Sequence, residues 1–371
     1  MRTTAAVVPA QGHDFVLREV ELDEPRADEV LVRIVATGLC HLDISSRETL
    51  PAEMFPRVFG HEGAGVVEQV GADVAGIEVG DHVLLGFRSC RACGPCREGA
   101  VAYCDHALAL NHTGVRPDGS TTHRLLDDDV DGTTPLFGSF LGQSSLAQHA
   151  LAHADNCVVV DWSLDLTLVA PYGCAFQTGA GTVLDVLGPA PDEPMVVVGV
   201  GAVGLAAVVA ARATGVRTVV AVDLDDRRLA AAERFGAVRV NPAYLGEQSV
   251  PDRVRELTGG GAAHAVDTTA VPAAVRDAQL ALRPRGTLVA LGLGTDDYAI
   301  DAVDLRQHGK VVRSSVHGDA DPLEILPRLL RLRAEGRFEV DHLLTRYPIA
   351  QVNAAVSDVL AGEVIQPVLV W

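Results

Sequence analysis

The chain has 371 residues, of which 48% are hydrophobic and 21% are charged, and this composition argues against disorder. At about 100–200 residues per domain, the length predicts two domains that each bury a core of their own. The formal net charge of −19 would repel phosphate backbones and anionic lipids, so we expect no nucleic-acid partner and no membrane partner.

The N-terminal half contains short strands separated by glycine-rich turns, which predicts a β-rich domain. Its first residues contain no long apolar stretch, so we expect no signal peptide and a cytoplasmic location. The alternating strand at residues 30–36 ends shortly before Cys40 in GLCHLD. His61 and Glu62 follow in FGHEGAGVVEQVG. Asp43 is a candidate to hydrogen-bond the second ring nitrogen of His61 and to fix its tautomer.

Four cysteines form one block in the segment SCRACGPCREGAVAYC: Cys90, Cys93, Cys96 and Cys104. The short gaps contain glycine and proline, so a loop can place all four thiolates around one tetrahedral zinc ion. Two disulfides are disfavoured in a reducing compartment, whereas an iron–sulfur cluster would also accept four cysteines. We interpret the block as a structural zinc site, because a closed four-thiolate shell leaves no position for chemistry.

Three cysteines lie outside this block. Cys157 begins an apolar strand in DNCVVVD and is expected to be a buried core residue. Cys174 lies in PYGCAFQTGAG, and taken alone it reads as a core cysteine, as Cys40 does. Two cysteines and one histidine are, however, a known catalytic zinc set with an open fourth position. Cys40, His61 and Cys174 therefore form a candidate site for a Lewis-acidic zinc that acts on a carbonyl or alcohol oxygen.

A dinucleotide-binding pattern begins in the second half of the chain. The apolar strand at residues 195–198 runs into GVGAVG, whose glycines are Gly199, Gly201 and Gly204. A helix at residues 205–215 and a strand at residues 218–222 follow and lead to Asp223. Glycines let the backbone approach a pyrophosphate at the helix N-terminus. An acidic residue at this position accepts hydrogen bonds from ribose hydroxyls and repels a 2′-phosphate, which favours NAD over NADP.

Strands and helices continue to alternate, which implies a parallel sheet with right-handed crossovers. The predicted strands are residues 238–240, 265–267 and 287–291, and the predicted helices are residues 225–235, 251–257 and 273–282. Proline-rich residues 187–194 form a connector. Residues 287–293 are a candidate edge strand that could extend the sheet into a second subunit, although charges can also blunt such an edge.

Together these residues resemble the zinc-dependent medium-chain alcohol dehydrogenases over nearly the whole chain. FGHEGAGVVEQVG is similar to that family's GHExxGxxxxxG signature, and the four-cysteine block is similar to its structural-zinc lobe. GVGAVG followed by Asp223 is similar to the family's coenzyme motif. Residues 140–151 and 173–181 resemble the aryl-alcohol (benzyl alcohol) dehydrogenase branch.

The resemblance implies an α/β fold class with two domains. A GroES-like β-rich catalytic domain would cover residues 1–170 and 314–371, with the structural-zinc lobe at about residues 88–106. A Rossmann domain with a doubly wound parallel sheet would cover residues 171–313 and bind NAD. Family members form dimers and tetramers, so a homodimer or homotetramer is expected. Each subunit would hold two zinc ions, one catalytic and one structural.

The resemblance also assigns roles to single residues. Cys40, His61 and Cys174 would bind the catalytic zinc, and Glu62 would lie behind the metal and approach it during ligand exchange. The implied coenzyme contacts are His41, Thr178, Gly199, Gly201, Val203, Gly204, Asp223, Arg228, Gly292 and Leu293. The implied substrate-pocket walls are Leu42, Gly86, Phe140 and Leu141, which could equally be plain loop and core residues.

One position departs from the family pattern. Leu42 stands where the family usually has a serine or threonine whose hydroxyl passes the alcohol proton towards solvent. Ser45 stands where a histidine often ends that relay. The proton route therefore stays open among a pocket water, His41 and Ser45.

The sequence thus predicts an NAD-dependent zinc alcohol dehydrogenase that interconverts a primary aromatic or allylic alcohol and its aldehyde by hydride transfer. Leu42 motivates an alternative, an NAD(P)H-dependent reductase of a conjugated carbonyl or iminium substrate. A non-catalytic dinucleotide-binding protein is a third reading, and the presence of all three zinc ligands speaks against it. The small-molecule substrate itself, the direction in the cell and the pathway lie beyond the sequence.

Overall fold

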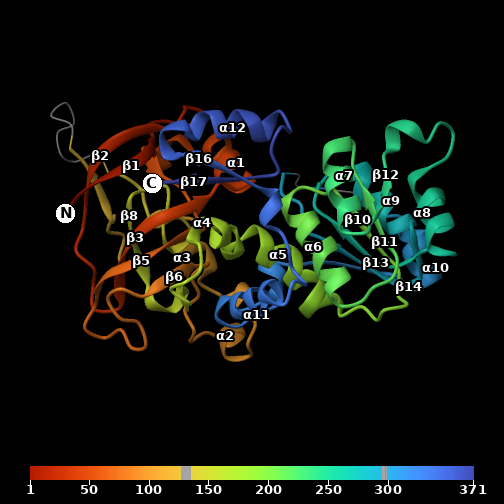
Figure 1. Cartoon of the computed structure of the whole chain (residues 1–371), viewed down its shortest axis with the longest axis horizontal. Helices are drawn as coiled ribbons and strands as arrows, with labels where there is room; N and C mark the ends of the chain where they lie inside the picture. The colour runs from red at the N-terminus through yellow and green to blue at the C-terminus, as the bar shows by residue number, and fades with distance from the viewer. Residues whose placement is uncertain (127–134, 295–296, 298) are drawn as a thin grey trace. The chain divides into compact units, whose positions relative to one another are not determined.

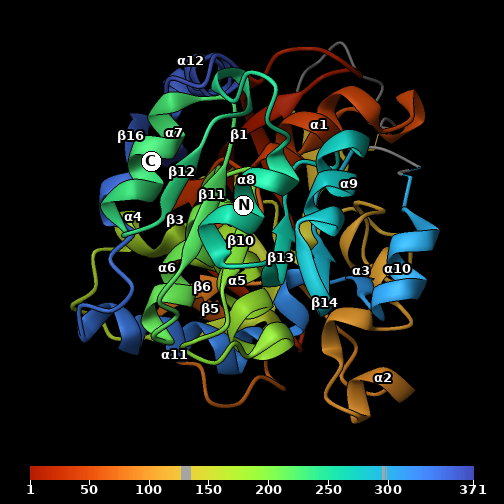
Figure 2. The ribbon, with the colours of Figure 1, turned by 90° about the vertical axis from the view of Figure 1, so that its right-hand side faces the viewer.

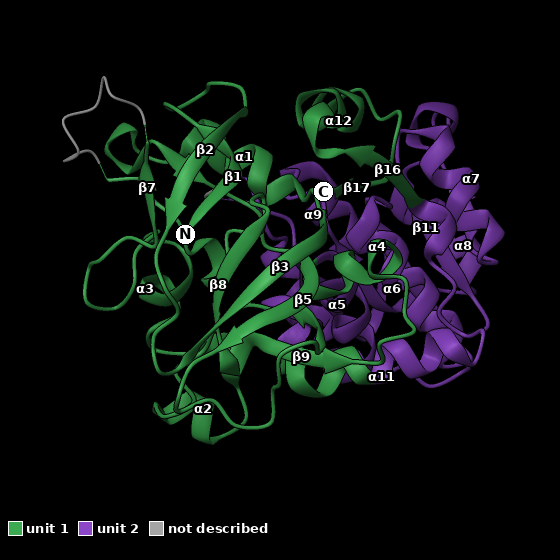
Figure 3. Cartoon of the chain, turned by 60° about the vertical axis from the view of Figure 1, so that its left-hand side comes forward, with its two compact units in different colours: residues 1–174, 321–327, 344–371 green, residues 175–320, 328–343 purple. Residues whose placement is uncertain are grey.

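The computed structural model describes residues 1–126, 135–294, 297 and 299–371 (Figure 1). The chain divides into two compact units (Figure 3). Unit 1 consists of residues 1–174, 321–327 and 344–371, and unit 2 consists of residues 175–320 and 328–343. None of the helices in the described part of the chain is both long enough and apolar enough to cross a bilayer.

Unit 1 is built on two sheets. The smaller sheet has the strand order β4 (Arg57–Val58), β1 (Arg2–Val8), β2 (Val16–Leu22) and β7 (His123–Leu125). The larger sheet has the order β16 (Leu344–Pro348), β17 (Gln366–Val370), β3 (Glu29–Gly38), β5 (Gly63–Val70), β6 (His82–Leu85) and β9 (Cys157–Val160), and β8 (His149–His153) also pairs with β3. Alternate residues of a strand face the same side, so Val30, Val32 and Ile34 of β3 share one apolar cluster.

The helices of unit 1 are short and lie between or after these strands. They are α1 (His41–Thr49), α2 (Gly94–Arg97), α3 (Ala107–Asn111), α4 (Leu166–Val169) and α12 (Val352–Leu360). In the described N-terminal half the strands are more numerous and contain more residues than the helices, in agreement with the β-rich character predicted from its short strands and glycine turns. Cys157 is buried at the start of β9, as expected.

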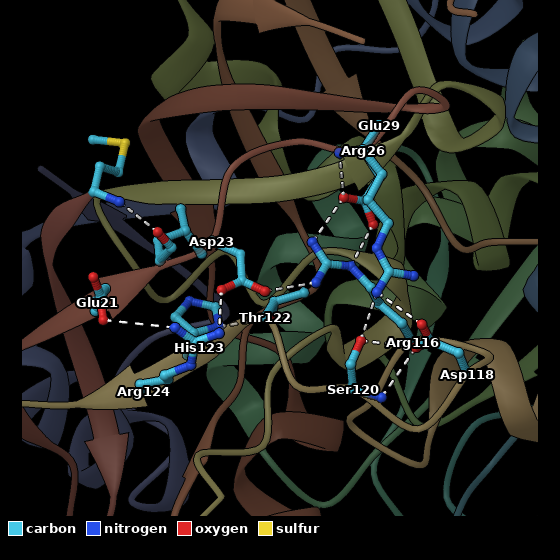
Figure 4. A network of polar contacts seen from close by, with 12 residues as sticks. Glu21, Asp23, Arg26, Glu29, Arg116, Asp118, Ser120, Thr122, His123 and Arg124 are labelled. Atoms are coloured by element: carbon cyan, nitrogen blue, oxygen red, sulfur yellow. Dashed lines mark hydrogen bonds and ion pairs between the residues drawn. The ribbon is translucent and has the colours of Figure 1, made fainter. Parts of the chain in front are cut away.

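The buried Arg116 joins Glu29 at the start of β3 to Asp23 in the loop before that strand (Figure 4). The Nε and Nη2 groups of Arg116 donate to the two carboxylate oxygens of Glu29 at 2.8 Å each. Its Nη1 group donates to Asp23 at 2.9 Å. The side chain of Arg116 is 3% exposed, and a bidentate, charge-assisted pair of this kind fixes geometry as well as adding energy. This network anchors the first residues of the strand whose other end leads to Cys40.

Unit 2 contains a six-stranded parallel sheet among the described residues. Its order is β12 (Val238–Val240), β11 (Val219–Val222), β10 (Met195–Val198), β13 (Ala262–Asp267), β14 (Leu282–Ala290) and β15 (Val311–Ser314). The first five labels follow one another across the unit from left to right in Figure 2. The strand order moves outward from β10 in both directions, which is the doubly wound arrangement implied by the family resemblance. The parallel pairing agrees with the prediction from the alternating elements.

Helices precede, separate and follow these strands along the chain, and the last of them, α11, begins in residues assigned to unit 1 and ends in residues assigned to unit 2. They are α5 (Ala175–Gly181), α6 (Ala202–Ala213), α7 (Asp226–Arg234), α8 (Val250–Thr258), α9 (Pro272–Leu280), α10 (Ala302–His308) and α11 (Pro322–Ala334). Val196 and Val198 of β10 share an apolar cluster with Val254 of α8 and Val275 of α9. Apolar residues on one strand and one helix face therefore meet as the sequence periodicity predicts.

The prediction of an edge strand at residues 287–293 is wrong. Residues 287–290 belong to β14, which pairs with β13 on one side and with β15 on the other. β15 was not predicted, because a four-residue strand that contains Arg313 gives little periodic signal. The described edges of this sheet are β12 and β15.

Candidate functional site

Cys40 is placed by the junction between a strand and a helix. β3 ends at Gly38, and Cys40 is the N-cap residue of α1 in an extended conformation. Its backbone N–H donates to Oδ2 of Asp43 at 3.1 Å. An acidic side chain that reaches back to the N-cap amide fixes the entry of the chain into the helix. The thiol of Cys40 is therefore held at a defined point by its own helix.

Asp43 also orients the histidine. Its Oδ1 atom lies 2.9 Å from Nδ1 of His61 and accepts the backbone N–H of Gly60 at 2.9 Å. Both Asp43 and His61 are fully buried. A carboxylate on one ring nitrogen directs the other nitrogen towards a metal, which is the role predicted for Asp43. Nε2 of His61 is buried and accepts or donates no hydrogen bond in the described structure.

Three other possible ligand residues gather around His61. One atom each from Cys40, His61, Glu62 and Cys174 lie within 4.8 Å of one another. The structure thus brings together the three predicted zinc ligands from the junction of β3 and α1, from the segment just before β5 and from residue 174, where the first segment of unit 1 ends. Two sulfurs and an imidazole nitrogen are ligands that zinc accepts in a three-ligand site. The orphaned Nε2 atom of His61 fits such an ion, because a metal would satisfy it.

The protonation of these groups follows from their burial and from one another. The hydrogen bond with Cys174 and burial raise the pKa of Cys40 well above its ordinary value. Burial lowers the pKa of His61, but Asp43 and Cys40 outweigh that effect and hold this pKa well above its ordinary value. A metal binds thiolate and neutral imidazole, so binding at this site must release protons.

Glu62 is the fourth member of this cluster, and Gln366 and Gly38 lie against its carboxylate. Its carboxylate is fully buried and accepts a hydrogen bond from Nε2 of Gln366 at 3.0 Å. A β-carbon at position 38 would lie 1.8 Å from Oε2 of Glu62, so only glycine leaves room for the carboxylate. Gln366 was not predicted, and its only signal is a polar residue inside the apolar strand β17.

The predicted pocket walls differ in their positions. The ring of Phe140 lies 5.5 Å from the ring of His61 in an edge-to-face arrangement, and Phe140 and Leu141 are buried. Leu42 is half-buried and packs against the same apolar cluster. Gly86 packs against Pro322, and a β-carbon at Gly86 would lie 2.8 Å from the Pro322 side chain. Of the predicted wall residues, Phe140 therefore lies against His61, Leu141 belongs to the same buried apolar cluster, and Leu42 packs against that cluster.

Ser45 is turned towards its own helix. Its hydroxyl donates to the backbone carbonyl of Leu42 at 3.4 Å. His41 is exposed at the first position of α1. Neither residue is joined to His61 by a hydrogen bond among the described contacts. The hydroxyl of Ser45 is therefore used within its own helix in this conformation.

The four-cysteine block forms a second cluster in unit 1. Sulfur atoms of Cys90, Cys93, Cys96 and Cys104 lie within 4.8 Å of one another, and all four cysteines are free. Cys90 and Cys96 are separated by 4.0 Å, and Cys93 and Cys104 by 3.9 Å. A tetrahedral ion with Zn–S bonds of about 2.3 Å requires sulfur separations of about 3.8 Å. These distances fit zinc and are far too long for disulfide bonds.

Backbone N–H groups point at these sulfurs. Cys90 accepts from Ala92 at 3.4 Å and from Cys93 at 3.2 Å, and Cys104 accepts from Cys90 and His106. The hydrogen bond from Ala92 is the main cause that lowers the pKa of Cys90 to about 7. Donors of this kind stabilise thiolates, so the loop suits a metal that carries positive charge.

In unit 2 the predicted coenzyme residues gather at the carboxyl ends of the strands. Gly199 has a φ of +80°, and a β-carbon at Gly204 would lie 2.0 Å from the Gly199 carbonyl oxygen. Gly199 is thus required for the turn and Gly204 for the close approach of α6, whereas a β-carbon at Gly201 would meet open space. Asp223 directly follows β11, and its carboxylate accepts backbone N–H groups from Val200 at 2.8 Å and from Asp225 at 2.9 Å. Nε of Arg228 on α7 is buried without a hydrogen-bond partner.

The remaining predicted contacts lie on neighbouring loops. A β-carbon at Gly292 would lie 2.2 Å from the Ala270 N atom, while Leu293 is 62% exposed. Thr178 lies on α5, and the adjacent Gly179 packs against the carbonyl oxygen of Val203 at the start of α6. Ligands of doubly wound sheets bind where strand order reverses. Gly199 and Asp223 directly follow β10 and β11, and Gly292 lies two residues after β14, at this edge of the sheet.

Comparison with known proteins shows to which family the chain belongs. A model of the "Alcohol dehydrogenase GroES-like domain" matches residues 26–161, and a model of "Zinc-binding dehydrogenase" matches residues 202–333. Geraniol dehydrogenase from Castellaniella defragrans is 38% identical, with 99% of this chain and 97% of that protein covered. The chain belongs to the zinc-dependent alcohol dehydrogenases.

Solved structures of other alcohol dehydrogenases agree with the fold of this one. An "alcohol dehydrogenase zinc-binding domain protein" from Burkholderia ambifaria is 41% identical, and benzyl alcohol dehydrogenase from Acinetobacter calcoaceticus is 34% identical. Each has a TM-score of 0.93 and covers 100% of this chain and 99% of its own. The predicted fold class, a GroES-like domain with a Rossmann-type domain, is confirmed. This alcohol dehydrogenase is accordingly a zinc-binding oxidoreductase.

Proposed function

We propose that this alcohol dehydrogenase uses NAD to interconvert a primary aromatic or allylic alcohol and its aldehyde. The observation that carries the proposal is the cluster of Cys40, His61 and Cys174 beside an apolar wall formed by Phe140, Leu141 and Leu42. An aromatic or isoprenoid side chain suits such a surface better than a short polar alcohol does. The relatives named for geraniol and benzyl alcohol support the same substrate classes.

Unit 1 would act as the catalytic domain. Cys40, His61 and Cys174 would hold the zinc, and Asp43 would keep Nε2 of His61 aimed at it. A zinc ion in such a site acts as a Lewis acid towards the substrate oxygen. Phe140 and Leu42 would help to exclude water from the reacting carbon, and the buried carboxylate of Glu62 would be available for ligand exchange. Cys90, Cys93, Cys96 and Cys104 would hold a structural zinc ion.

Unit 2 would act as the coenzyme domain. The glycine turn before α6 leaves room for a pyrophosphate, and the nicotinamide ring of the coenzyme accepts or supplies the hydride. Asp223 favours NAD, because its carboxylate would repel a 2′-phosphate. We further propose a cytoplasmic homodimer or homotetramer, in which the edge strand β15, with Val311 48% exposed, is one surface available for pairing.

The proposal is tested by NADH formation with benzylic, allylic and aliphatic alcohols, each with NAD and with NADP. We expect turnover with the benzylic and allylic members, and with NAD in strong preference to NADP. Cys40→Ala should abolish turnover, while Cys157→Ala, which removes a buried thiol outside the cluster, should retain it. A protein with two zinc ions that oxidises no alcohol but reduces conjugated carbonyls would favour the alternative motivated by Leu42.

A further inference from the structure

Two segments run side by side behind the proposed zinc site. The backbone N–H of Leu146 donates to the carbonyl of Phe59 at 2.9 Å, and that of Ser145 donates to the carbonyl of Gly60 at 3.0 Å. A β-carbon at Gly60 would lie 2.2 Å from the Leu146 N atom, so the two backbones are in direct contact here. At Ser144 the chain turns into a left-handed conformation with a φ of +55°. The backbone pairing ends before it reaches His61.

The side chain of Gln143 continues the pairing beyond that point. Its Nε2 group donates to the carbonyl of His61 at 3.0 Å, and its Oε1 atom accepts the backbone N–H of Gly63 at 3.0 Å. Nε2 also lies 3.2 Å from the carbonyl oxygens of Leu85 and Gly86. The side chain is 1% exposed. One carboxamide therefore binds both sides of the segment that carries His61 and Glu62.

The chemistry of the position requires an amide. The His61–Gly63 segment presents one acceptor and one donor, and a carboxamide carries the same donor and acceptor as a peptide group. A glutamate of the same shape would accept from Gly63 but would face three carbonyl oxygens without a proton to donate. A methionine of similar length would leave all these buried groups without a partner, which is costly.

The loop that carries Gln143 is strained and held in place. Ser139, Leu141 and Ser144 are not glycines but have φ values of 51°, 47° and 55°. The hydroxyl of Ser144 accepts the backbone N–H of Phe140 at 2.9 Å and donates to the carbonyl of Val58 at 2.8 Å. Such conformations persist only where the surroundings fix them, and they concentrate at functional sites. Here the strained loop directs Phe140 to the His61 ring and Gln143 to the His61 backbone.

We propose that Gln143 is a positioning residue of the zinc centre, which fixes the backbone of residues 61–63 and thereby aims His61 and Glu62. The inference rests on the proposed function, since it assumes zinc at Cys40, His61 and Cys174. Removing partners that orient zinc ligands commonly weakens metal binding by about 10–100-fold. Gln143 acts through the backbone and does not itself contact the metal or the substrate.

The test compares Gln143→Glu and Gln143→Met with Ser145→Ala. Ser145 lies in the same loop, and its hydroxyl is buried against that of Thr37 at 2.9 Å, so its removal costs a buried hydrogen bond without touching residues 61–63. Zinc content per chain and the rate of zinc transfer to a chelator are measured for each purified protein. The zinc of the four-cysteine cluster provides an internal reference in every sample.

We expect both Gln143 variants to release one of two zinc ions about 10–100-fold faster than the wild type, with the second ion unchanged. In a Cys40→Ala background the Gln143 substitutions should change nothing further. Release rates within about twofold of Ser145→Ala in either folded Gln143 variant would overturn the inference. A wild-type protein that binds one zinc ion, with Cys40→Ala identical to it, would instead contradict the proposed function. Should Gln143→Glu fail to fold, Gln143→Met decides.

Discussion

At the scale of single residues, Asp43 carries the strongest prediction. Its carboxylate accepts the backbone N–H groups of Cys40 and Gly60 and pairs with the ring of His61, all while fully buried. Asp43→Asn replaces one acceptor oxygen by a donor that faces other donors. We expect kcat to fall by about 10–100-fold, together with zinc content at the cysteine–histidine site. Asp161→Asn, in an exposed turn, is the control, and equal activity in both variants would contradict this role.

Sequence reasoning found the residues that carry chemistry and missed those that support them. Cys40, His61 and Cys174 were predicted because rare residue types in a known combination indicate a metal site, and the structure brings their ligand atoms together. Gln143 and Gln366 were missed, because their partners lie 80 and 304 positions away along the chain. Only the folded backbone reveals such long-range hydrogen bonds.

At the scale of elements, the four-cysteine lobe depends on its metal. Its two helical segments, α2 and residues Val101–Tyr103, span only four and three residues, and Cys90 and Cys93 are partly exposed. Metal binding in such a loop supplies folding free energy. Cys104→Ser should lower the melting temperature of the protein by several degrees and reduce bound zinc by one ion. Calorimetry with zinc analysis measures both, with Cys157→Ser as the matched buried-cysteine control.

An unchanged melting temperature in zinc-depleted Cys104→Ser would show that the lobe folds without metal.

Regular elements were the most predictable part of the fold, since alternating apolar strands and capped helices carry their signal locally. β10 and β12 begin and end at the predicted residues, and α7 begins after its N-cap Asp225. β15 was not predicted, because a strand of four residues that includes an arginine shows too little hydrophobic periodicity. Without β15, the edge of the sheet was predicted at the wrong strand.

At the scale of the whole molecule, buried histidines should make unit 1 sensitive to acid. Burial lowers the pKa of His123 to about 4, and burial also lowers the pKa values of His112 and His149. In the unfolded chain a histidine titrates near 6.5. As pH falls from about 6.5 to about 4, these histidines bind protons in the unfolded state but not in the folded state, so the free energy of unfolding decreases. For His123 alone the loss is about 3 kcal/mol.

Thermal melting between pH 7 and pH 4 checks this expectation. In His123→Gln the melting temperature should fall less steeply with pH than in the wild type, because the uncharged amide has no proton to gain. His13→Gln is the matched control, since His13 is exposed, and its melting curve should follow the wild type throughout. Parallel slopes for all three proteins would mean that His123 contributes nothing to acid sensitivity.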